Sequence, residues 1–287
     1  VSPYSDIYGG LVLNATINLY TYATIEETND GLVSINSYDS DCRQSFPLTD
    51  KLEIDGKASL IKGVYNRIVR DYHPKWTGFK ITTYNDAPAG SGLGTSSTMV
   101  VCIIKAFVEW LSLPLGDYEI ARMAYEVERK DLNPLKVKRW ITDELEASLL
   151  LYFTGRSRAS AAIIDQQKAN TTNKESKSIE AMHRIKQSAN DMKLALLKGD
   201  MREFARILGR AWEDKKKMAD AITNPVIEQA FEVATQAGAV AGKVSGAGGG
   251  GFCMFMVEPT KKKVVIDALK QLDGFVMPFQ FTDGGAH

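Results

Sequence analysis

Cysteine and histidine are both scarce in this chain of 287 residues. The three cysteines, Cys42, Cys102 and Cys253, are widely spaced and odd in number, which excludes a disulfide framework and fits a reducing cytosol. The three histidines are too scattered for a zinc site or for a Ser-His hydrolase. We therefore expect a cytoplasmic protein with a core that contains Cys102 and Cys253, and we do not expect its many serines to be nucleophiles.

An excess of charge and long apolar runs are also lacking. Lys+Arg and Asp+Glu both number 35, so no overall basic field attracts nucleic acid or an anionic membrane. No apolar run approaches the ~20 residues that span a bilayer, and no signal peptide is visible at the start. The lysine runs 215–217 and 261–263 lie beside helical patterns, and we predict that they are solvated faces. The expected partners are small molecules, and the oligomeric state is left open.

The length and the apolar spacing predict two domains of mixed α+β structure, with a boundary between residues 143 and 144. In residues 1–143 the patterns predict strands within 11–24 and at 78–84, and helices over 58–71, from Met99 onward and over 117–131. In residues 144–287 they predict strands at 149–153, 252–257 and 274–281, and helices over 158–169, 175–220, 225–237 and 261–272. The β-loop-β-α-β ending is typical of a split βαβ, ferredoxin-like domain.

The segment 88–98, which reads PAGSGLGTSST, joins a predicted strand to a predicted helix. Its glycines allow the backbone to approach an anion, and the helix that follows presents unpaired N–H groups and the positive end of its dipole. A plain helix cap needs only one hydroxyl and one glycine, whereas four hydroxyl residues follow three glycines here. The segment therefore predicts a phosphate site.

This loop differs from a Walker A motif, because no lysine follows its last glycine. Neutralisation of phosphate charge must then come from the helix dipole and from Mg²⁺. One hydroxyl and one carboxylate can suffice for Mg²⁺, which keeps several waters.

A second glycine-rich segment, 243–251, reads KVSGAGGGG. By letter, Gly246, Gly248 and Gly251 match the dinucleotide fingerprint, but that motif opens a helix, whereas a strand pattern follows here. This context disfavours a Rossmann oxidoreductase. A glycine-rich bend between strands can lie against another loop and close over a ligand. The alternative is a flexible hairpin without chemical consequence.

Both segments, in this order, resemble the second and third motifs of the GHMP kinase superfamily. Residues 88–97 are similar to P-x-x-x-G-L-G-S-S-A, with Thr95 in place of the first Ser, and residues 243–251 to K-x-[ST]-G-A-G-G-G-G. Residues 8–13 are similar to the tail of the first motif, so we expect further residues before Val1. The resemblance covers nearly the whole chain. It implies a two-domain GHMP kinase fold, with a ribosomal S5 domain 2-like N-terminal domain and a ferredoxin-like C-terminal domain.

Within the superfamily, residues 126–132, 152–160 and 278–281 look most like D-glycero-D-manno-heptose 7-phosphate kinases, which phosphorylate the anomeric oxygen of a heptose phosphate. The resemblance implies ATP and Mg²⁺ as cofactors. The residues implied to bind the ATP phosphates are Pro88, Gly90, Ser91, Gly92, Leu93, Gly94, Thr95, Ser96 and Ser97. The implied metal ligands are Ser96 and Glu128. The loop 243–251 would contact the phosphate loop and the substrate through Gly246, Gly248 and Gly249.

A phosphorylated sugar needs a cationic pocket. Arg156 and Arg158 follow a predicted strand, and arginine forks match phosphate geometry, although an ordinary surface loop is an equal alternative. Asp6 and Tyr8 precede the Gly9-Gly10 turn and could contact sugar hydroxyls.

The catalytic base is not identified by the motifs. Related kinases place an Asp about a dozen residues after the matching Glu, in a glycine-rich stretch. Here Leu132 is followed directly by Asn133 and Pro134, and Asp131 is too close to Glu128. The expected segment is missing between Leu132 and Asn133. Two alternatives therefore stay open: a GHMP kinase for fucose, galactose or mevalonate, and a non-catalytic nucleotide or sugar sensor with the same fold.

Overall fold

The computed structural model describes residues 8–56, 58–88, 90–128, 135–155, 167, 169 and 176–282. The chain forms two compact units. One, here called the C-terminal unit, comprises Val1–Asn18, Gly90–Leu93 and Leu135–Asp283. The other, the N-terminal unit, comprises Leu19–Ala89, Gly94–Pro134 and Gly284–His287. Residues 90–93 thus belong to the unit that the second half of the chain builds.

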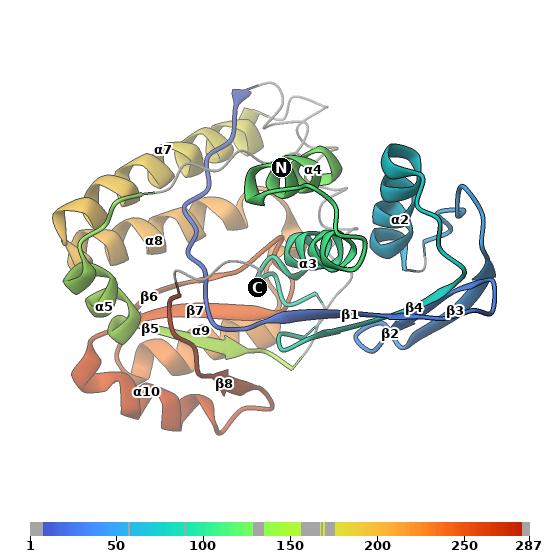
Figure 1. The fold of residues 1–287 in the computed structure, drawn as a ribbon. Coiled ribbons are helices and arrows are strands. Elements are labelled where there is room, and N and C mark those ends of the chain that lie inside the picture. Colours follow the sequence, from blue (N-terminus) through green and yellow to red (C-terminus); the bar gives the residue numbers. More distant parts are fainter. Residues whose placement is uncertain are drawn as a thin grey trace. The chain divides into compact units, whose positions relative to one another are not determined.

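The N-terminal unit contains one four-stranded sheet with helices on one face (Figure 1). The strands, in sheet order, are β1 (Thr21–Glu27), β4 (Phe79–Asn85), β2 (Leu32–Ser37) and β3 (Cys42–Pro47). β2 and β4 are parallel and the other neighbours are antiparallel. The helices are α2 (Ser59–Tyr72), α3 (Thr95–Trp110) and α4 (Asp117–Glu128).

The alternation of residue types along the strands explains why this sheet has one covered face. In β2, Val33 and Ile35 are buried in one core with side chains of α2 and α3, while Ser34 and Asn36 point to the opposite face. A period of two puts alternate side chains on opposite faces of a sheet. The helix predicted over 58–71 and the strand predicted over 78–84 are confirmed within a residue at each end.

The C-terminal unit contains an antiparallel sheet in the order β6-β7-β5-β8. Its strands are β5 (Leu149–Phe153), β6 (Ala239–Val244), β7 (Phe252–Val257) and β8 (Phe275–Met277). Helices separate β5 from β6 and β7 from β8, which is the split βαβ connectivity that the sequence predicted.

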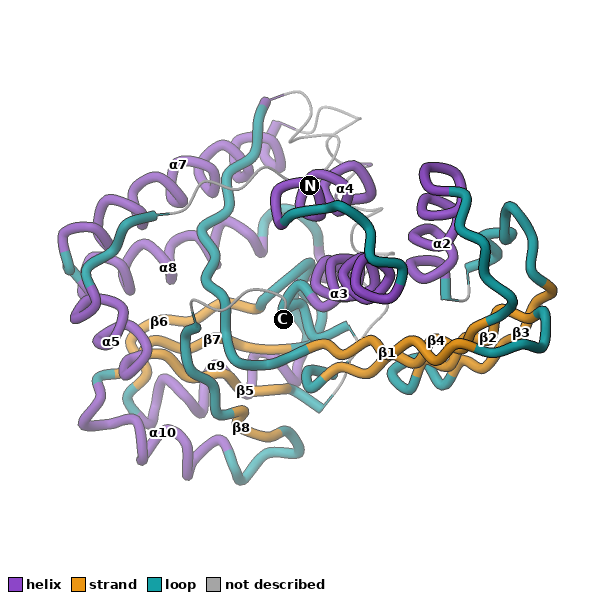
Figure 2. The backbone as a smooth tube through the Cα atoms, viewed as in Figure 1, coloured by secondary structure: helices purple, strands orange, loops and turns teal. Residues whose placement is uncertain are grey.

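Helices cover both faces of this sheet (Figure 2). α5 (Arg139–Ser148), α7 (Ser176–Lys198) and α8 (Met201–Lys216) share a core with one face, and α9 (Pro225–Ala237) and α10 (Lys262–Leu269) share a core with the other. Short 3₁₀ turns, η1 (Asp220–Ile222) and η2 (Pro259–Lys261), precede α9 and α10. All five residues of β5, LLLYF, are buried, as expected for a strand covered on both sides.

Three of the predicted elements differ from the structure. The strand predicted at 274–281 is confined to β8, Phe275–Met277. The strand predicted within 11–24 begins only at Thr21, with one isolated bridge at Ile17 before it. The helix predicted over 175–220 breaks at Gly199, whose φ is +73°, and Asp200 then caps α8 by accepting a hydrogen bond from the Glu203 N–H at 2.9 Å. The helix predicted over 158–169 lies outside the described residues, except for residues 167 and 169, which are helical.

The cysteines are free thiols. Cys253 is buried in the core, as predicted, and burial raises the pKa of its thiol to about 12, so it is unreactive at neutral pH. Cys102 is partly buried, and its Sγ donates to the Thr21 carbonyl oxygen at 3.3 Å.

Candidate active site

The first glycine-rich loop leads into α3 through Gly94, which is the N-cap of that helix. Gly94 has a φ of +83°, and a Cβ placed there would meet nothing within 4 Å. A glycine cap has no side chain, so no side-chain cap occupies the N–H groups of the first turn. The hydroxyls of Thr95 and Ser96 have no hydrogen-bond partner among the described residues, and Ser96 is exposed. This helix end is therefore open to an anion.

The second glycine-rich loop joins β6 directly to β7. The Ser245 N–H donates to the Phe252 carbonyl oxygen at 2.8 Å and closes the hairpin. The strand that follows the glycines confirms the predicted context and removes the dinucleotide interpretation, which requires a helix at this point.

The two glycine-rich segments touch backbone to backbone within the C-terminal unit. A Cβ on Gly92 would lie 2.7 Å from the Ser245 carbonyl oxygen, and a Cβ on Gly251 would lie 2.6 Å from the Ser91 carbonyl oxygen. The Phe252 N–H donates to that same Ser91 oxygen at 3.1 Å. Only glycine permits such close approach, so the glycines of both motifs are needed for one packed arrangement.

The middle of the second loop is held by the segment before α9. The Gly249 N–H donates to the Ile222 carbonyl oxygen at 2.7 Å, and the Asn224 Nδ2 donates to the Gly249 carbonyl oxygen at 3.0 Å. A Cβ on Gly248 would lie 2.8 Å from the same Ile222 oxygen. Sequence reasoning missed this support, although Asn224 before Pro225 is a typical helix-cap signal.

Ser91 is completely buried, and its Oγ has no hydrogen-bond partner among the described atoms. A buried polar group left unpaired costs about 1–3 kcal/mol. Beside it, the Gly251 carbonyl oxygen accepts hydrogen bonds from the N–H and the Oγ1 of Thr154, both at 3.1 Å. Because the Ser91 side chain is completely buried, its hydroxyl lies within the contact between the two loops and not on an exposed surface.

Lys215, in the last turn of α8, contacts the second loop directly. Its Nζ donates to the carbonyl oxygens of Gly246 at 2.5 Å and Val244 at 3.1 Å. Burial, together with the nearby charge of Lys243, lowers the pKa of Lys215 to about 7, and burial also lowers the pKa of Lys243.

The prediction of a solvated lysine run is therefore wrong for Lys215, although the exposed Lys217 pairs with Asp214 at 3.1 Å. The missed signal is helical phase. Lys215 follows the buried Leu208 and Trp212 at helical spacing, so it lies on the inward stripe of α8.

Of the remaining predicted residues, only Tyr8 has a described side chain, and it contacts α7. The Tyr8 carbonyl oxygen accepts a hydrogen bond from the Lys186 Nζ at 2.6 Å, and its ring makes an edge contact with His183. Glu128 ends α4, but its side chain is not among those described. Asp6, Arg156 and Arg158 also lie outside the described residues.

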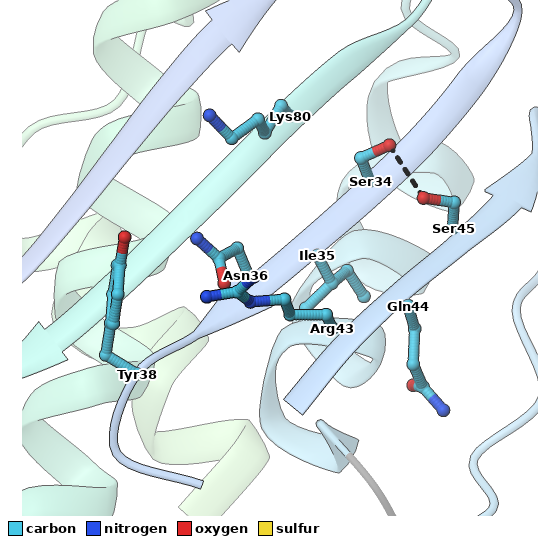
Figure 3. Close-up of a pocket in the computed structure, with 8 residues that line it drawn as sticks. All are labelled: Ser34, Ile35, Asn36, Tyr38, Arg43, Gln44, Ser45 and Lys80. Carbon is cyan, nitrogen blue, oxygen red and sulfur yellow. Dashed lines mark hydrogen bonds between the residues drawn. The ribbon is translucent and has the colours of Figure 1, made fainter. Parts of the chain in front are cut away.

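A shallow hollow of about 440 Å³ lies on the exposed face of the N-terminal sheet (Figure 3). Its lining includes Asn36 and Arg43, which are paired across β2 and β3, and Lys80 of β4. Ser34 and Ser45 share a hydrogen bond of 3.0 Å there. Neither glycine-rich motif contributes to this hollow, so it is separate from the candidate site.

Two features are absent from the described residues. In that part of the chain, no group of three or more His, Cys, Asp or Glu side chains could hold a metal ion. No described helix combines the length and the apolar character needed to cross a membrane.

Comparison with known proteins agrees with this arrangement. The GHMP kinases N terminal domain family matches residues 59–134, and the GHMP kinases C terminal family matches residues 192–273. The D-glycero-alpha-D-manno-heptose 7-phosphate kinase of Campylobacter jejuni is 42% identical over 315 residues, covering 99% of this chain and 92% of the relative.

Solved structures give the same result. A D-glycero-D-manno-heptose 1-phosphate kinase from Bacteroides thetaiotaomicron is 59% identical with a TM-score of 0.78, covering 100% of this chain and 92% of that one. The mevalonate kinase of Methanococcus jannaschii is 20% identical with a TM-score of 0.77, covering 98% of this chain and 94% of that one, and it shows the shared fold. With both family domains matched and a relative this similar over nearly its full length, the chain belongs to the GHMP kinases, which use ATP.

Proposed function

We propose that this kinase transfers the γ-phosphoryl group of ATP to the anomeric hydroxyl of D-glycero-D-manno-heptose 7-phosphate. The observation that carries the proposal is the direct contact of the two glycine-rich motifs, in a chain 42% identical to a heptose 7-phosphate kinase. In the reaction, the anomeric oxygen attacks the γ-phosphorus, the bond to the ADP oxygen breaks, and the hydroxyl proton leaves. The products are ADP and a heptose 1,7-bisphosphate.

The ATP phosphates would be held by the loop and by the first turn of α3. The proposed domain of residues 1–143 supplies the phosphate loop, although residues 90–93 of that loop pack in the C-terminal unit. The proposed domain of residues 144–287 supplies the third motif. The N–H groups of the first turn of α3, which no side-chain cap occupies, and the helix dipole would stabilise the negative charge that phosphoryl transfer moves toward ADP. The exposed glycine Gly90 leaves room for a phosphate to approach the backbone.

The donor set fits Mg²⁺, which prefers oxygen ligands and keeps several waters. Ser96 offers an exposed hydroxyl without a described partner, and Glu128 ends the helix that packs on α3. When bound, Mg²⁺ would neutralise phosphate charge, a task that no lysine of this loop can perform. Thr95 and Ser97 would donate to phosphate oxygens beside it.

The sugar would be held by residues from three segments. Arg156 and Arg158, in the loop after β5, would pair with the sugar phosphate, and Asp6 and Tyr8 would contact sugar hydroxyls. Gly246, Gly248 and Gly249 would line the substrate side of the third motif.

The catalytic base is not assigned. The alignment with the Campylobacter jejuni kinase runs over 315 residues, more than the 287 of this chain, so that relative carries residues without a counterpart here. A segment missing after Leu132 agrees with this difference. General-base assistance is worth about 10²–10⁴-fold, so a chain without it would turn over slowly yet still bind ATP. This observation keeps a non-catalytic sensor as the second candidate function.

The test is ADP release with Mg-ATP and a panel of acceptors. The panel holds heptose 7-phosphate, heptose 1-phosphate, free heptose, fucose, galactose and mevalonate. Both phosphate positions are included because the two similar kinases are named for different heptose phosphates. Turnover with heptose 7-phosphate alone supports the proposal. Turnover with another acceptor keeps the kinase and replaces the substrate, and ATP binding without any turnover favours the sensor.

The metal assignment has its own test. Glu128→Ala should lower turnover far more than it lowers ATP binding measured without metal, because the carboxylate acts through Mg²⁺. Glu119→Ala, in the first turn of the same helix, is the control. Equal turnover of Glu128→Ala and the wild type would remove Glu128 from the site.

A further inference from the structure

Two half-buried lysines lie at the start of the second glycine-rich loop. The ammonium of Lys215 is fixed by backbone carbonyls of that loop, at 2.5 Å for the Gly246 oxygen. Lys243 lies on β6, two residues after Ala241, which faces Gly209 of α8. Because alternate strand residues share a face, Lys243 is on the α8 side of the sheet as well. Lysines from two separate elements therefore converge on one loop.

Neither lysine has an acidic partner in the described part of the chain. Lys216 and Lys217, the neighbours of Lys215, each pair with an acidic residue of α8, at 2.8 and 3.1 Å. Around the Lys215 ammonium the described contacts are instead backbone carbonyls, the charge of Lys243, and the ring of Trp212, whose centroid is 5.7 Å away. The positive charge at this loop is therefore uncompensated among the described residues.

Uncompensated charge that is partly removed from water is unfavourable, and two like charges make it more so. Burial lowers the pKa of both lysines, because the charged form of each lysine is destabilised where water is partly excluded. A bound anion would stabilise the charged form of both lysines and raise their pKa again. A phosphate monoester carries about −1.5 to −2 charges at pH 7 and has three strong acceptor oxygens, which suits two ammonium groups.

We propose that Lys215 and Lys243, with the backbone of residues 244–246, form a binding site for a phosphate group. The phosphate could come from the sugar substrate or from the terminal phosphate of ATP. The choice between these sources rests on the proposed function, whereas the site itself does not. Lys215 has two tasks here, since its contacts with the loop carbonyls also position the third motif against residues 91 and 92.

The experiment measures binding by calorimetry for the wild type, Lys215→Met, Lys243→Met and the control Lys216→Met. The ligands are Mg-ATP, heptose 7-phosphate, and free heptose, which lacks the phosphate. Each lysine-to-methionine change at the site should weaken binding of one phosphorylated ligand by about tenfold or more, the worth of a charge-assisted hydrogen bond. Free heptose and the control variant should show no such loss.

The two ligands distinguish the sources. A loss confined to heptose 7-phosphate places the sugar phosphate at the lysines, and a loss confined to Mg-ATP places the nucleotide phosphate there. Unchanged affinity for both ligands in Lys215→Met and Lys243→Met overturns the proposal. If Lys215→Met does not unfold cooperatively, Lys215→Gln is measured in its place. Glutamine keeps a hydrogen-bond donor for the carbonyl oxygens but lacks the charge.

Inorganic phosphate tests the lysine site without any assumption about the substrate. Phosphate should raise the unfolding temperature of the wild type and of Lys216→Met, and raise it less in the two site variants. This result would support the site even if no heptose phosphate were turned over. Equal stabilisation of all four proteins by phosphate would count against the site even in an active heptose kinase.

Discussion

The start of α3 at Gly94 and the loop at 244–251 both have glycines with positive φ, yet an added methyl group would meet different surroundings in each. At Gly94 a Cβ would meet nothing within 4 Å, whereas at Gly246, Gly248 and Gly251 it would meet backbone at 2.6–2.8 Å. The glycine at the helix start thus leaves an open surface for a ligand. The glycines of the second loop allow close packing. Glycine thus leaves space for a ligand at the start of α3 and allows close backbone contact in the second loop.

The two loops also differ in how they present positive charge. The first offers the N–H groups of α3 and no lysine, and the second has Lys215 and Lys243 beside it. A helix end and a lysine pair both stabilise phosphate, but only a lysine can lose its charge, and the lowered pKa of about 7 lets Lys215 do so near neutral pH.

The largest effect is expected from a substitution that disrupts the packing of the two loops against each other. In Gly251→Ala the new Cβ would clash with the Ser91 carbonyl group at a residue whose φ is +84°. The free energy of unfolding should fall by roughly 2–3 kcal/mol, because strain and a backbone clash add. Kinase activity should be largely lost. Urea unfolding measures the first effect and ADP release the second.

Gly209→Ala is the control for that change. Gly209 lies inside α8, and its Cβ would meet only the Ala241 side chain, at an ordinary 3.6 Å. This variant should gain up to about 1 kcal/mol, since alanine favours the helix. A Gly251→Ala protein as stable and active as the wild type would contradict the close contact of the two loops.

A smaller effect is expected at the open glycine. Gly94→Ala and Gly31→Ala both introduce a side chain at positive φ with nothing within 4 Å, so each should lose about 1 kcal/mol of stability. Only Gly94→Ala should also weaken binding of Mg-ATP, by roughly tenfold, because its methyl group occupies the approach to the helix end. Calorimetry compares the two variants. Equal ATP affinities would mean that the phosphates bind elsewhere.

The smallest effect concerns the pH dependence of stability. The pKa of Lys215 falls from 10.5 to about 7 on folding, so between these values the unfolded chain holds a proton that the folded chain has released. Stability therefore rises with pH across this window and gains nothing below it. Lys215→Met should remove part of the rise, measured as urea midpoints from pH 7 to pH 9.

Lys216→Met, which leaves Lys215 intact, should keep the wild-type slope in that experiment. The titratable group that faces Lys215 from β6 is Lys243, and the loop adds only backbone. On its own helix, Asp214 is engaged by Arg184 and Lys217. A wild-type slope in Lys215→Met would show that Lys215 keeps an ordinary pKa.

Much of the fold could be predicted from local patterns. The apolar spacing of residues 58–71 gave helix α2, the run at 149–153 gave a buried strand, and Pro225 marked the start of α9. Such features depend on neighbours a few residues away, so a local sequence pattern is enough to predict them. The break at Gly199 was missed because helical apolar spacing continues on both sides of it.

The candidate site was predictable as two motifs. The glycine spacing and the hydroxyl run predicted an anion site at the start of a helix, and the strand after Gly251 argued against dinucleotide binding. The lysine pair could not be predicted in the same way. Lys215 stands in a run of three lysines that suggests solvent, and its contacts are with residues about 30 positions along the chain.

By itself the sequence determined the two glycine-rich loops, the elements that flank them, the family that they resemble and the charge balance that disfavours nucleic acid. The tertiary structure decided that residues 90–93 pack in the C-terminal unit, that Gly92 and Gly251 touch the opposite loop, and that Lys215 lacks an acidic partner in the described chain. The physical reason is the separation along the chain of the residues that interact. Backbone conformation follows from nearby residues, but the environment of a charge or of a missing side chain follows from whatever the fold brings against it.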